Sequence, residues 1–201
     1  LRAKGHDVTV YNRTTAKAEK WVSEHGGQLA KTPVEAAEGQ DIVFACVGND
    51  NDLREVTLGA QGAFKGVKKG AIFVDHTTAS AGIARELHAA ASAAGFGFLD
   101  APVSGGAQGA RDASLAIMAG AEADALERVR PLLQAMGKRI VHVGPPGAGQ
   151  VAKACNQMIM VAATQACAEA LRLANAHGLD LAALRSALMA GSAGSRVLEL
   201  M

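Results

Sequence analysis

The chain lacks an excess of charge of either sign, a basic cluster, and a hydrophobic run long enough to cross a bilayer. Its 201 residues include 20 Lys and Arg against 19 Asp and Glu, a formal net charge of +1. Binders of nucleic acid or of membrane surfaces usually carry a basic patch, and a membrane-spanning helix needs about 20 apolar residues. We therefore expect neither a nucleic-acid nor a membrane partner.

Cysteine is scarce, and the spacing typical of metal sites or disulfide frameworks is absent. Cys46, Cys155 and Cys167 lie among Val, Ala and Ile residues and never form a Cys-x-x-Cys pair. This pattern predicts buried, reduced thiols, no metal site, and a cytoplasmic protein in preference to a disulfide-linked secreted one.

The first residues resemble the last turn of a helix. Cations precede Gly5 in the stretch from Leu1 to His6, as they commonly do where a helix stops. We therefore expect a first strand, its glycine-rich turn and most of a first helix to lie upstream of Leu1.

Short apolar runs alternate with helical patterns up to residue 143. The predicted strands are 7–11, 41–47, 71–74, 96–99, 115–118 and 139–143, and helices are predicted at 14–25, 80–94 and 123–136. Such alternation predicts an α/β fold with a mostly parallel sheet covered on both faces, and the continuous run 41–47 is typical of a strand buried on both faces. Ligands bind such sheets at the carboxyl ends of the strands.

No strand pattern follows Gly147. A long helix is predicted over 151–176, Gly178 marks its end, and a further helix runs to about Ala190. We therefore predict a sheet domain over residues 1–146, followed over 147–201 by a long connecting helix and the start of an all-α domain.

The end of the first predicted strand carries an arginine and no acid. In dinucleotide-binding folds an acid at this place binds the ribose 2′-hydroxyl of NAD, whereas an arginine accommodates the 2′-phosphate of NADP. Here Tyr11 is followed by Asn12, Arg13 and Thr14, and Thr14 is placed to cap the next helix. A solvated arginine beside a helix cap explains the same residues without a ligand.

Two further strand ends offer polar or small residues. Val47 and Gly48 follow one strand, and Gly48 permits the close approach of a flat ligand, although a plain loop glycine is equally consistent. Asp75-His76-Thr77-Thr78 ends the next strand, and Ser80 is expected to cap the following helix. The chain has no Gly-x-Ser-x-Gly motif, so the Asp-His pair does not indicate a nucleophilic serine enzyme.

The stretch "DAPVSGGAQGA" follows the strand 96–99. Pro102 fixes the backbone, and Ser104, Gly105 and Gly106 then present consecutive amide groups with little side-chain bulk. Such a concavity binds small anions, and no Lys-Ser/Thr pair follows as a triphosphate loop requires. We expect a carboxylate here; a long flexible turn is the alternative.

The long helix begins with "GAGQVAKACNQ". Lys153 and Asn156 are three residues apart and therefore share a helix face in apolar surroundings. Burial would lower the pKa of Lys153 and suit it to proton transfer. A lysine that extends its ammonium group to water is the alternative.

These motifs, in this order, resemble those of the β-hydroxyacid dehydrogenase family, which includes 3-hydroxyisobutyrate dehydrogenase, tartronate semialdehyde reductase and glyoxylate/succinic semialdehyde reductases. The resemblance rests on "DHTTAS", "DAPVSGG" and "GAGQVAKACNQ". It implies a Rossmann-type NAD(P)-binding domain joined by a long helix to an all-α domain that forms homo-oligomers, usually dimers, and an enzyme that transfers a hydride between NADP(H), or NAD(H), and a small 3-hydroxy acid or semialdehyde.

The resemblance also implies residue roles and two departures. Lys153 would be the catalytic acid/base and Asn156 would orient the substrate. The substrate carboxylate would lie at Ser104, Gly105, Gly106 and Thr78, and the cofactor at Asn12, Arg13, Thr14, Val47, Gly48 and Thr78. The family's glycine-rich diphosphate loop and the rest of its helical domain, which carries a further lysine, are absent, so we expect the fold to be truncated at both ends.

Two other functions are compatible with the same architecture. Imine reductases share it but generally replace the catalytic lysine, so Lys153 argues against that activity. A non-catalytic nucleotide-binding scaffold would require neither the Lys153–Asn156 pair nor the Ser-Gly-Gly stretch.

Overall fold

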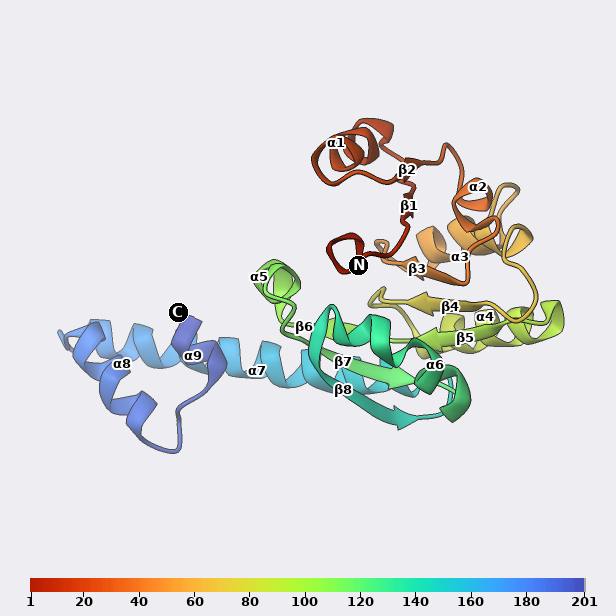
Figure 1. Ribbon diagram of the computed structural model, residues 1–201. Coiled ribbons are helices and arrows are strands. Elements are labelled where there is room, and N and C mark those ends of the chain that lie inside the picture. The colour runs from red at the N-terminus through yellow and green to blue at the C-terminus, as the bar shows by residue number, and fades with distance from the viewer. Residues whose placement is uncertain (201) are drawn as a thin grey trace. The chain divides into compact units, whose positions relative to one another are not determined.

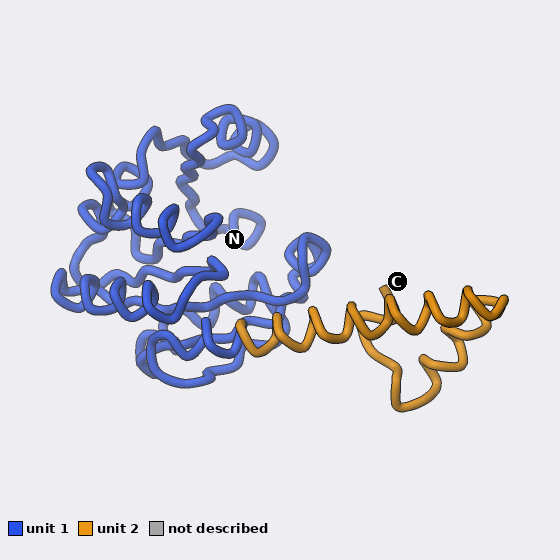
Figure 2. The backbone as a smooth tube through the Cα atoms, turned by 180° about the vertical axis from the view of Figure 1, so that it is seen from behind, with its two compact units in different colours: residues 1–153 blue, residues 154–201 orange. Residues whose placement is uncertain are grey.

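The computed structural model describes residues 1–200, which form two compact units, Leu1–Lys153 and a second that begins at Ala154 (Figures 1 and 2). The strands are β1 (Thr9–Val10), β2 (Gln28–Leu29), β3 (Ile42–Ala45), β4 (Ile72–Asp75), β5 (Gly97–Asp100), β6 (Val103–Ser104), β7 (Leu115–Gly120) and β8 (Gly137–Gly144). The helices are α1 (Thr15–His25), α2 (Pro33–Ala37), α3 (Asp50–Leu58), α4 (Ala81–Ala94), α5 (Gly106–Arg111), α6 (Ala123–Gln134), α7 (Ala148–Ala176), α8 (Leu181–Ala190) and α9 (Arg196–Leu200), with 3₁₀ turns at Arg2–Lys4 and Ala63–Lys65.

The first unit is built around one six-stranded sheet, which confirms the predicted α/β fold. Its order is β3-β4-β5-β7-β6, and β8 pairs with β7. Strands β3, β4 and β5 run parallel, as do β7 and β8, whereas β7 is antiparallel to β5 and β6. Strands β1 and β2 form a separate parallel pair. Because β3, β4 and β5 are parallel, their carboxyl ends lie side by side at one end of the strands (Figure 1).

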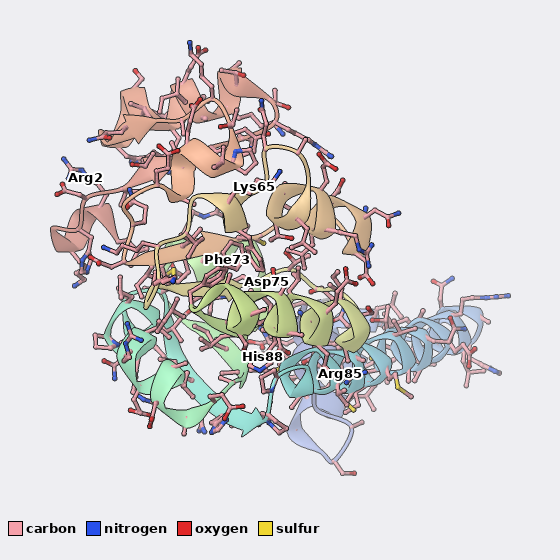
Figure 3. The ribbon with its side chains drawn as sticks, turned by 90° about the vertical axis from the view of Figure 1, so that its right-hand side faces the viewer. Arg2, Lys65, Phe73, Asp75, Arg85 and His88 are labelled. Atoms are coloured by element: carbon pink, nitrogen blue, oxygen red, sulfur yellow. The ribbon has the colours of Figure 1, made fainter. Side chains whose placement is uncertain are left out.

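Helices cover both faces of this sheet. Leu126, Val129 and Leu133 of α6 pack with Ile72 and Val74 on one face. On the other face, α3 and α4 pack against Phe73 and Phe98, and Figure 3 shows Phe73 beside α4. Successive residues of β4 point to opposite faces, and all four are buried. The continuous apolar pattern of this strand is therefore explained by burial on both sides.

Strand β3 is packed on both faces of the sheet, but less completely than β4. All four of its residues are only partly buried, and among residues 1–200 the strand pairs only with β4. Ile42 and Phe44 pack against the core on one face of the sheet, and Val43 and Ala45 pack against the core on the other. The strand is therefore covered on both faces as predicted, but its side chains are not fully buried.

The cysteines also differ from expectation. All three are free, but Cys46 and Cys155 are exposed and Cys167 is only partly buried. Cys46 follows the edge strand β3, and the other two lie on α7, where neighbours in sequence point in different directions around the helix. Apolar sequence neighbours therefore did not imply apolar surroundings.

Several short elements had no sequence signal strong enough to predict them. They are β2, β6, α2, α3, α5 and α9, together with the 3₁₀ turn at Ala63–Lys65. The 3₁₀ turn at Arg2–Lys4 ends at Gly5 with a φ of 86°, as expected for a glycine that terminates a helical turn.

The second unit contains the rest of α7 from Ala154, followed by α8 and α9. Asp180 caps α8 by accepting hydrogen bonds from the amides of Ala182 (2.8 Å) and Ala183 (3.3 Å). The compact units divide within α7, and the domain boundary predicted at residue 147 stays a prediction. Within residues 1–200, none of the helices has both the length and the apolar character that spanning a membrane requires.

Candidate active site

Two buried carboxylates lie side by side at the ends of β4 and β5. Asp75 and Asp100 are register partners in the sheet, and neither side chain is exposed. Asp75 Oδ1 accepts a hydrogen bond from the amide of Thr77 (2.9 Å), whereas its Oδ2 is buried without a partner among residues 1–200. Burial raises the pKa of Asp75 to about 7, and the neighbouring Asp100 carboxylate adds to the rise. A pKa of about 7 would place the change in protonation of Asp75 near neutral pH.

Asp100 anchors the first turn of α7. One carboxylate oxygen accepts from the amide of Gly147 (2.6 Å) and the other from the amide of Gln150 (2.9 Å). Burial raises the pKa of Asp100, and these backbone hydrogen bonds oppose the rise. The carboxylate also lies at the helix end where the backbone dipole favours negative charge. The sequence marked Asp100 only as the first residue of a loop motif, and this role depends on a residue 47 positions away.

Gln150 ties the same turn to the loop after β4. Its side-chain nitrogen donates to the carbonyl of Thr77 (2.7 Å), and its side-chain oxygen accepts from the amide of Ala79 (2.9 Å). The Thr77 hydroxyl in turn accepts from the amide of Val47 (3.1 Å). The loops that follow β3 and β4 are therefore fixed to each other and to the start of α7 by buried or partly buried hydrogen bonds.

Lys153 lies one turn further along α7, and it does not extend to water. It is 8% exposed, and its Nζ donates a hydrogen bond to the carbonyl of Val103 (2.8 Å). Desolvation by the surrounding protein lowers the pKa of Lys153. Val103 directly precedes Ser104, Gly105 and Gly106, so the structure brings the amine against the predicted carboxylate loop.

That loop is more regular than the sequence suggested. Val103 and Ser104 form β6, which pairs with β7, and α5 begins at Gly106. Gly105 and Gly106 adopt φ values of 134° and 63°, which side-chain-bearing residues rarely adopt. A Cβ on Gly106 would meet no atom within 4 Å. The backbone conformation at both positions favours glycine, and the space beside Gly106, but not beside Gly105, is free of atoms from residues 1–200.

Asn156 belongs to the second unit and is partly buried. Its side-chain amide donates to the side-chain oxygen of the neighbouring Gln157 (2.9 Å). The orientation of Asn156 toward a substrate stays a prediction from its position on α7.

A cleft in the first unit gathers most of the residues predicted to bind a cofactor. Its lining includes the loops after β1 and β3, with Asn12, Arg13, Thr14, Val47 and Gly48. Thr78 is exposed and does not line this cleft, although the adjacent Thr77 is bonded to Val47. The structure therefore brings five of the six predicted positions together.

The N-termini of α1 and α4 differ in how their backbone amides are capped. Thr14 makes no side-chain hydrogen bond to α1; the side chain of Asn12 accepts from the amide of Thr14 instead (2.9 Å). The prediction that the Thr14 side chain caps α1 is therefore wrong. Ser80 caps α4 as predicted, accepting from the amide of Ile83 (3.1 Å), and it also donates to Asp50 (2.5 Å).

The raised pKa of Asp75 predicts a pH dependence of stability. Between its ordinary pKa of 3.8 and about 7, the folded protein holds a proton that the unfolded chain has released. Stability should therefore fall as pH rises through this window, by at most roughly 1.4 kcal/mol per pH unit. Asp75→Asn stays neutral, so we expect it to exceed the wild type in stability at pH 8 and to match it near pH 4.

Urea denaturation at pH 4, 6 and 8 measures this difference. Asp124→Asn, which alters an exposed carboxylate on α6, controls for the loss of a negative charge. Parallel stability curves for Asp75→Asn and the wild type across this range would show that Asp75 does not take up the proton.

Family models match both parts of the chain. Residues 1–144 match the NAD-binding domain of 6-phosphogluconate dehydrogenase. Residues 147–201 match a domain described as NAD-binding of NADP-dependent 3-hydroxyisobutyrate dehydrogenase.

Individual relatives agree with these matches. A Shewanella frigidimarina protein described as an uncharacterized oxidoreductase is 48% identical over 99% of this chain and 68% of its own length. The 3-hydroxyisobutyrate dehydrogenase of Pseudomonas aeruginosa is 37% identical over 100% of this chain and 67% of its own length. The chain spans 62%, 66% and 58% of three related Arabidopsis thaliana proteins, described as probable 3-hydroxyisobutyrate dehydrogenase-like proteins.

Solved structures extend the likeness to the fold. The Mycobacterium tuberculosis 3-hydroxyisobutyrate dehydrogenase with L-serine superposes with a TM-score of 0.88, at 33% identity over 97% of this chain and 66% of that one. An imine reductase from Myxococcus stipitatus, at 22% identity and a TM-score of 0.82, shares the fold. The family models, the relatives and the shared fold together show that this chain belongs to the β-hydroxyacid dehydrogenase family.

Proposed function

We propose that the protein to which this chain belongs transfers a hydride between NADP(H) and a small 3-hydroxy acid or its semialdehyde, such as 3-hydroxyisobutyrate, tartronate semialdehyde or succinic semialdehyde. The observation that carries the proposal is the hydrogen bond of 2.8 Å from Lys153 Nζ to the carbonyl of Val103. It fixes a desolvated amine directly beside Ser104, Gly105 and Gly106. A substrate with a carboxylate at this loop would bring its own hydroxyl or carbonyl group within reach of the amine.

Different residues of the chain would bind the substrate and transfer the proton. The nicotinamide, when bound, supplies or accepts the hydride. Protonated Lys153 donates to the oxygen of a carbonyl substrate as it gains negative charge, and neutral Lys153 accepts the proton of an alcohol substrate. Desolvation lowers the pKa of Lys153, so the neutral amine is easier to reach than for an exposed lysine. Ser104, Gly105 and Gly106 hold the carboxylate, and Asn156, three residues along α7, orients the reacting oxygen.

The cleft is compatible with a dinucleotide. A Cβ on Gly48 would lie 2.6 Å from the carboxylate of Asp52, so this position keeps the backbone bare at the cleft surface. Within the cleft, Val47 would lie on the nicotinamide side, and Asn12, Arg13 and Thr14 would lie on the adenosine side. Thr78 lies outside the cleft lining, and its contact with the nicotinamide stays a prediction. Arg13 would contact the ribose 2′ position, and no acid accompanies it in sequence, which favours NADP(H) over NAD(H).

Arg13→Asp should invert this cofactor preference. The guanidinium offers charge-assisted hydrogen bonds to a phosphate, each contributing roughly 1.5–3 kcal/mol, so the ratio of kcat/KM for NADPH to that for NADH should fall by about one to two orders of magnitude. Steady-state kinetics with both cofactors measure the ratio, and Arg139→Asp on the exposed part of β8 is the matched control. A clear preference of the wild type for NADH would contradict the assignment of Arg13.

Turnover with a panel of substrates tests the function itself. We expect NADPH-dependent reduction of small semialdehydes that carry a carboxylate, and little reduction of their methyl esters, which lack the charge that the loop would hold. The panel includes 3-hydroxyisobutyrate and L-serine for the oxidising direction and a cyclic imine as the test for imine reduction. Turnover of the imine alone would favour an imine reductase, and cofactor binding without any turnover would favour a non-catalytic scaffold.

A homo-oligomeric assembly and a cytoplasmic location stay predictions for the protein that carries this chain. The assembly is predicted from the family resemblance, and the location from the cysteine pattern. Size-exclusion chromatography with light scattering measures the assembly.

A further inference from the structure

The arginine expected to read the cofactor is already paired with a carboxylate. Arg13 Nη1 lies 3.0 Å from Asp52 Oδ1, and this is the only side-chain hydrogen bond of Arg13 within residues 1–200. The two residues are 39 positions apart in sequence, and both line the cofactor cleft. No sequence motif pointed to Asp52 as the partner of Arg13.

Asp52 is the fixed member of the pair. It stands in the first turn of α3, where its amide donates to the side-chain oxygen of Asn49 (3.0 Å) and its Oδ2 accepts from the side-chain nitrogen of Asn49 (3.3 Å). The helix start favours a negative charge at this position. The Asp52 side chain is 27% exposed, whereas that of Arg13 is 77% exposed. Arg13 is therefore the member that can turn away.

The Arg13–Asp52 ion pair would interact differently with a 2′-phosphate and with a 2′-hydroxyl on the ribose. A 2′-phosphate must take Arg13 from Asp52, and the carboxylate that it leaves behind repels the incoming anion. An uncharged 2′-hydroxyl requires no such exchange and can itself donate to a carboxylate. Asp52 therefore opposes the selectivity that Arg13 supplies.

We propose that Asp52 is a specificity-determining residue that competes with the cofactor's 2′-phosphate for Arg13 and so keeps the preference for NADP(H) over NAD(H) small. The inference rests on the proposed nucleotide-binding function and refines it. The neighbouring Gly48 belongs to the same arrangement, because a Cβ there would lie 2.6 Å from Asp52 Oδ2 and displace the carboxylate.

Binding of two cofactor fragments tests the proposal without relying on catalysis. Adenosine 2′,5′-bisphosphate carries the 2′-phosphate, and 5′-AMP carries the 2′-hydroxyl. Isothermal titration calorimetry of the full-length protein should show that Asp52→Asn binds the bisphosphate about three- to tenfold more tightly than the wild type, a size expected for one like charge near the protein surface. The affinity for 5′-AMP should stay within about twofold or weaken.

Two further variants separate competition from general charge effects. Glu86→Gln removes the carboxylate of another exposed ion pair, that of Arg54 with Glu86 (2.8 Å), which does not line the cleft. This variant should leave both affinities unchanged. In an Arg13→Ala background, Asp52→Asn should keep only the part of its effect on the bisphosphate that comes from direct charge repulsion, and the gain should be smaller than in the wild-type background, because no guanidinium remains to be released.

The possible failures are distinguishable. An unchanged affinity ratio in Asp52→Asn, with both fragments bound, would overturn this inference and leave the proposed function intact. An equal gain with Arg13 absent would overturn competition as its mechanism. A wild-type protein that binds neither fragment would overturn the proposed adenosine site, and the inference with it.

Discussion

Lys153→Ala is expected to reduce turnover by about two to four orders of magnitude, the usual contribution of a positioned proton-transfer group. The amine is the only functional group on this turn of α7 that is bonded to the start of the Ser-Gly-Gly loop. Without it, the reacting oxygen must exchange its proton with water. Steady-state turnover in both directions measures the loss, with the wild-type substrate and cofactor at saturation.

Two companion variants separate proton transfer from charge and from orientation. Lys153→Arg should not restore activity, because a guanidinium stays protonated and cannot act as a base. Asn156→Ala should cost less than Lys153→Ala, since it removes orientation and keeps the proton path. Circular dichroism and cofactor titration confirm that each variant folds and binds. Near-normal turnover in a folded Lys153→Ala variant would reject the assigned mechanism.

Gly149→Ala is expected to displace the N-terminal turn of α7 and to lower both the free energy of unfolding and turnover. A Cβ at this position would lie 2.5 Å from the carbonyl oxygen of Met118 and 2.7 Å from that of Asp100. Both atoms are backbone at the ends of β7 and β5, so they cannot rotate away. Overpacking of this kind typically costs about 1–3 kcal/mol, and a shift of about 1 Å at a catalytic group can cost about a hundredfold in rate.

Gly82→Ala is the matched control. Gly82 is the second residue of α4, as Gly149 is of α7, but the nearest atom to its added Cβ is the Ser80 hydroxyl at 3.4 Å. An alanine is intrinsically favoured over glycine within a helix by roughly 0.5–1 kcal/mol. We therefore expect Gly82→Ala to be neutral or slightly stabilising. Thermal unfolding and turnover of both variants provide the comparison, and equal effects would show that Gly149 is not a packing contact.

The sequence predicted the order of the major elements because their signals are local. The apolar run that forms β4 and the serine that caps α4 each act within a few residues, and both are found as expected. Short elements such as β6 and α5 were not predicted, because their residues were interpreted as a carboxylate-binding glycine loop. Strand β6 depends on pairing with β7, which no local pattern encodes.

The sequence by itself determined the fold class, the family motifs and the residue types that could carry acid–base chemistry and cofactor contacts. Only the tertiary structure decided how these residues are paired: Lys153 with the Val103 carbonyl, Asp100 with the start of α7, and Arg13 with Asp52. Local patterns follow from backbone geometry and side-chain burial over a few residues. The three pairings join residues 39 to 50 positions apart, so they arise only when strand order and register bring separate strand ends and helix starts together.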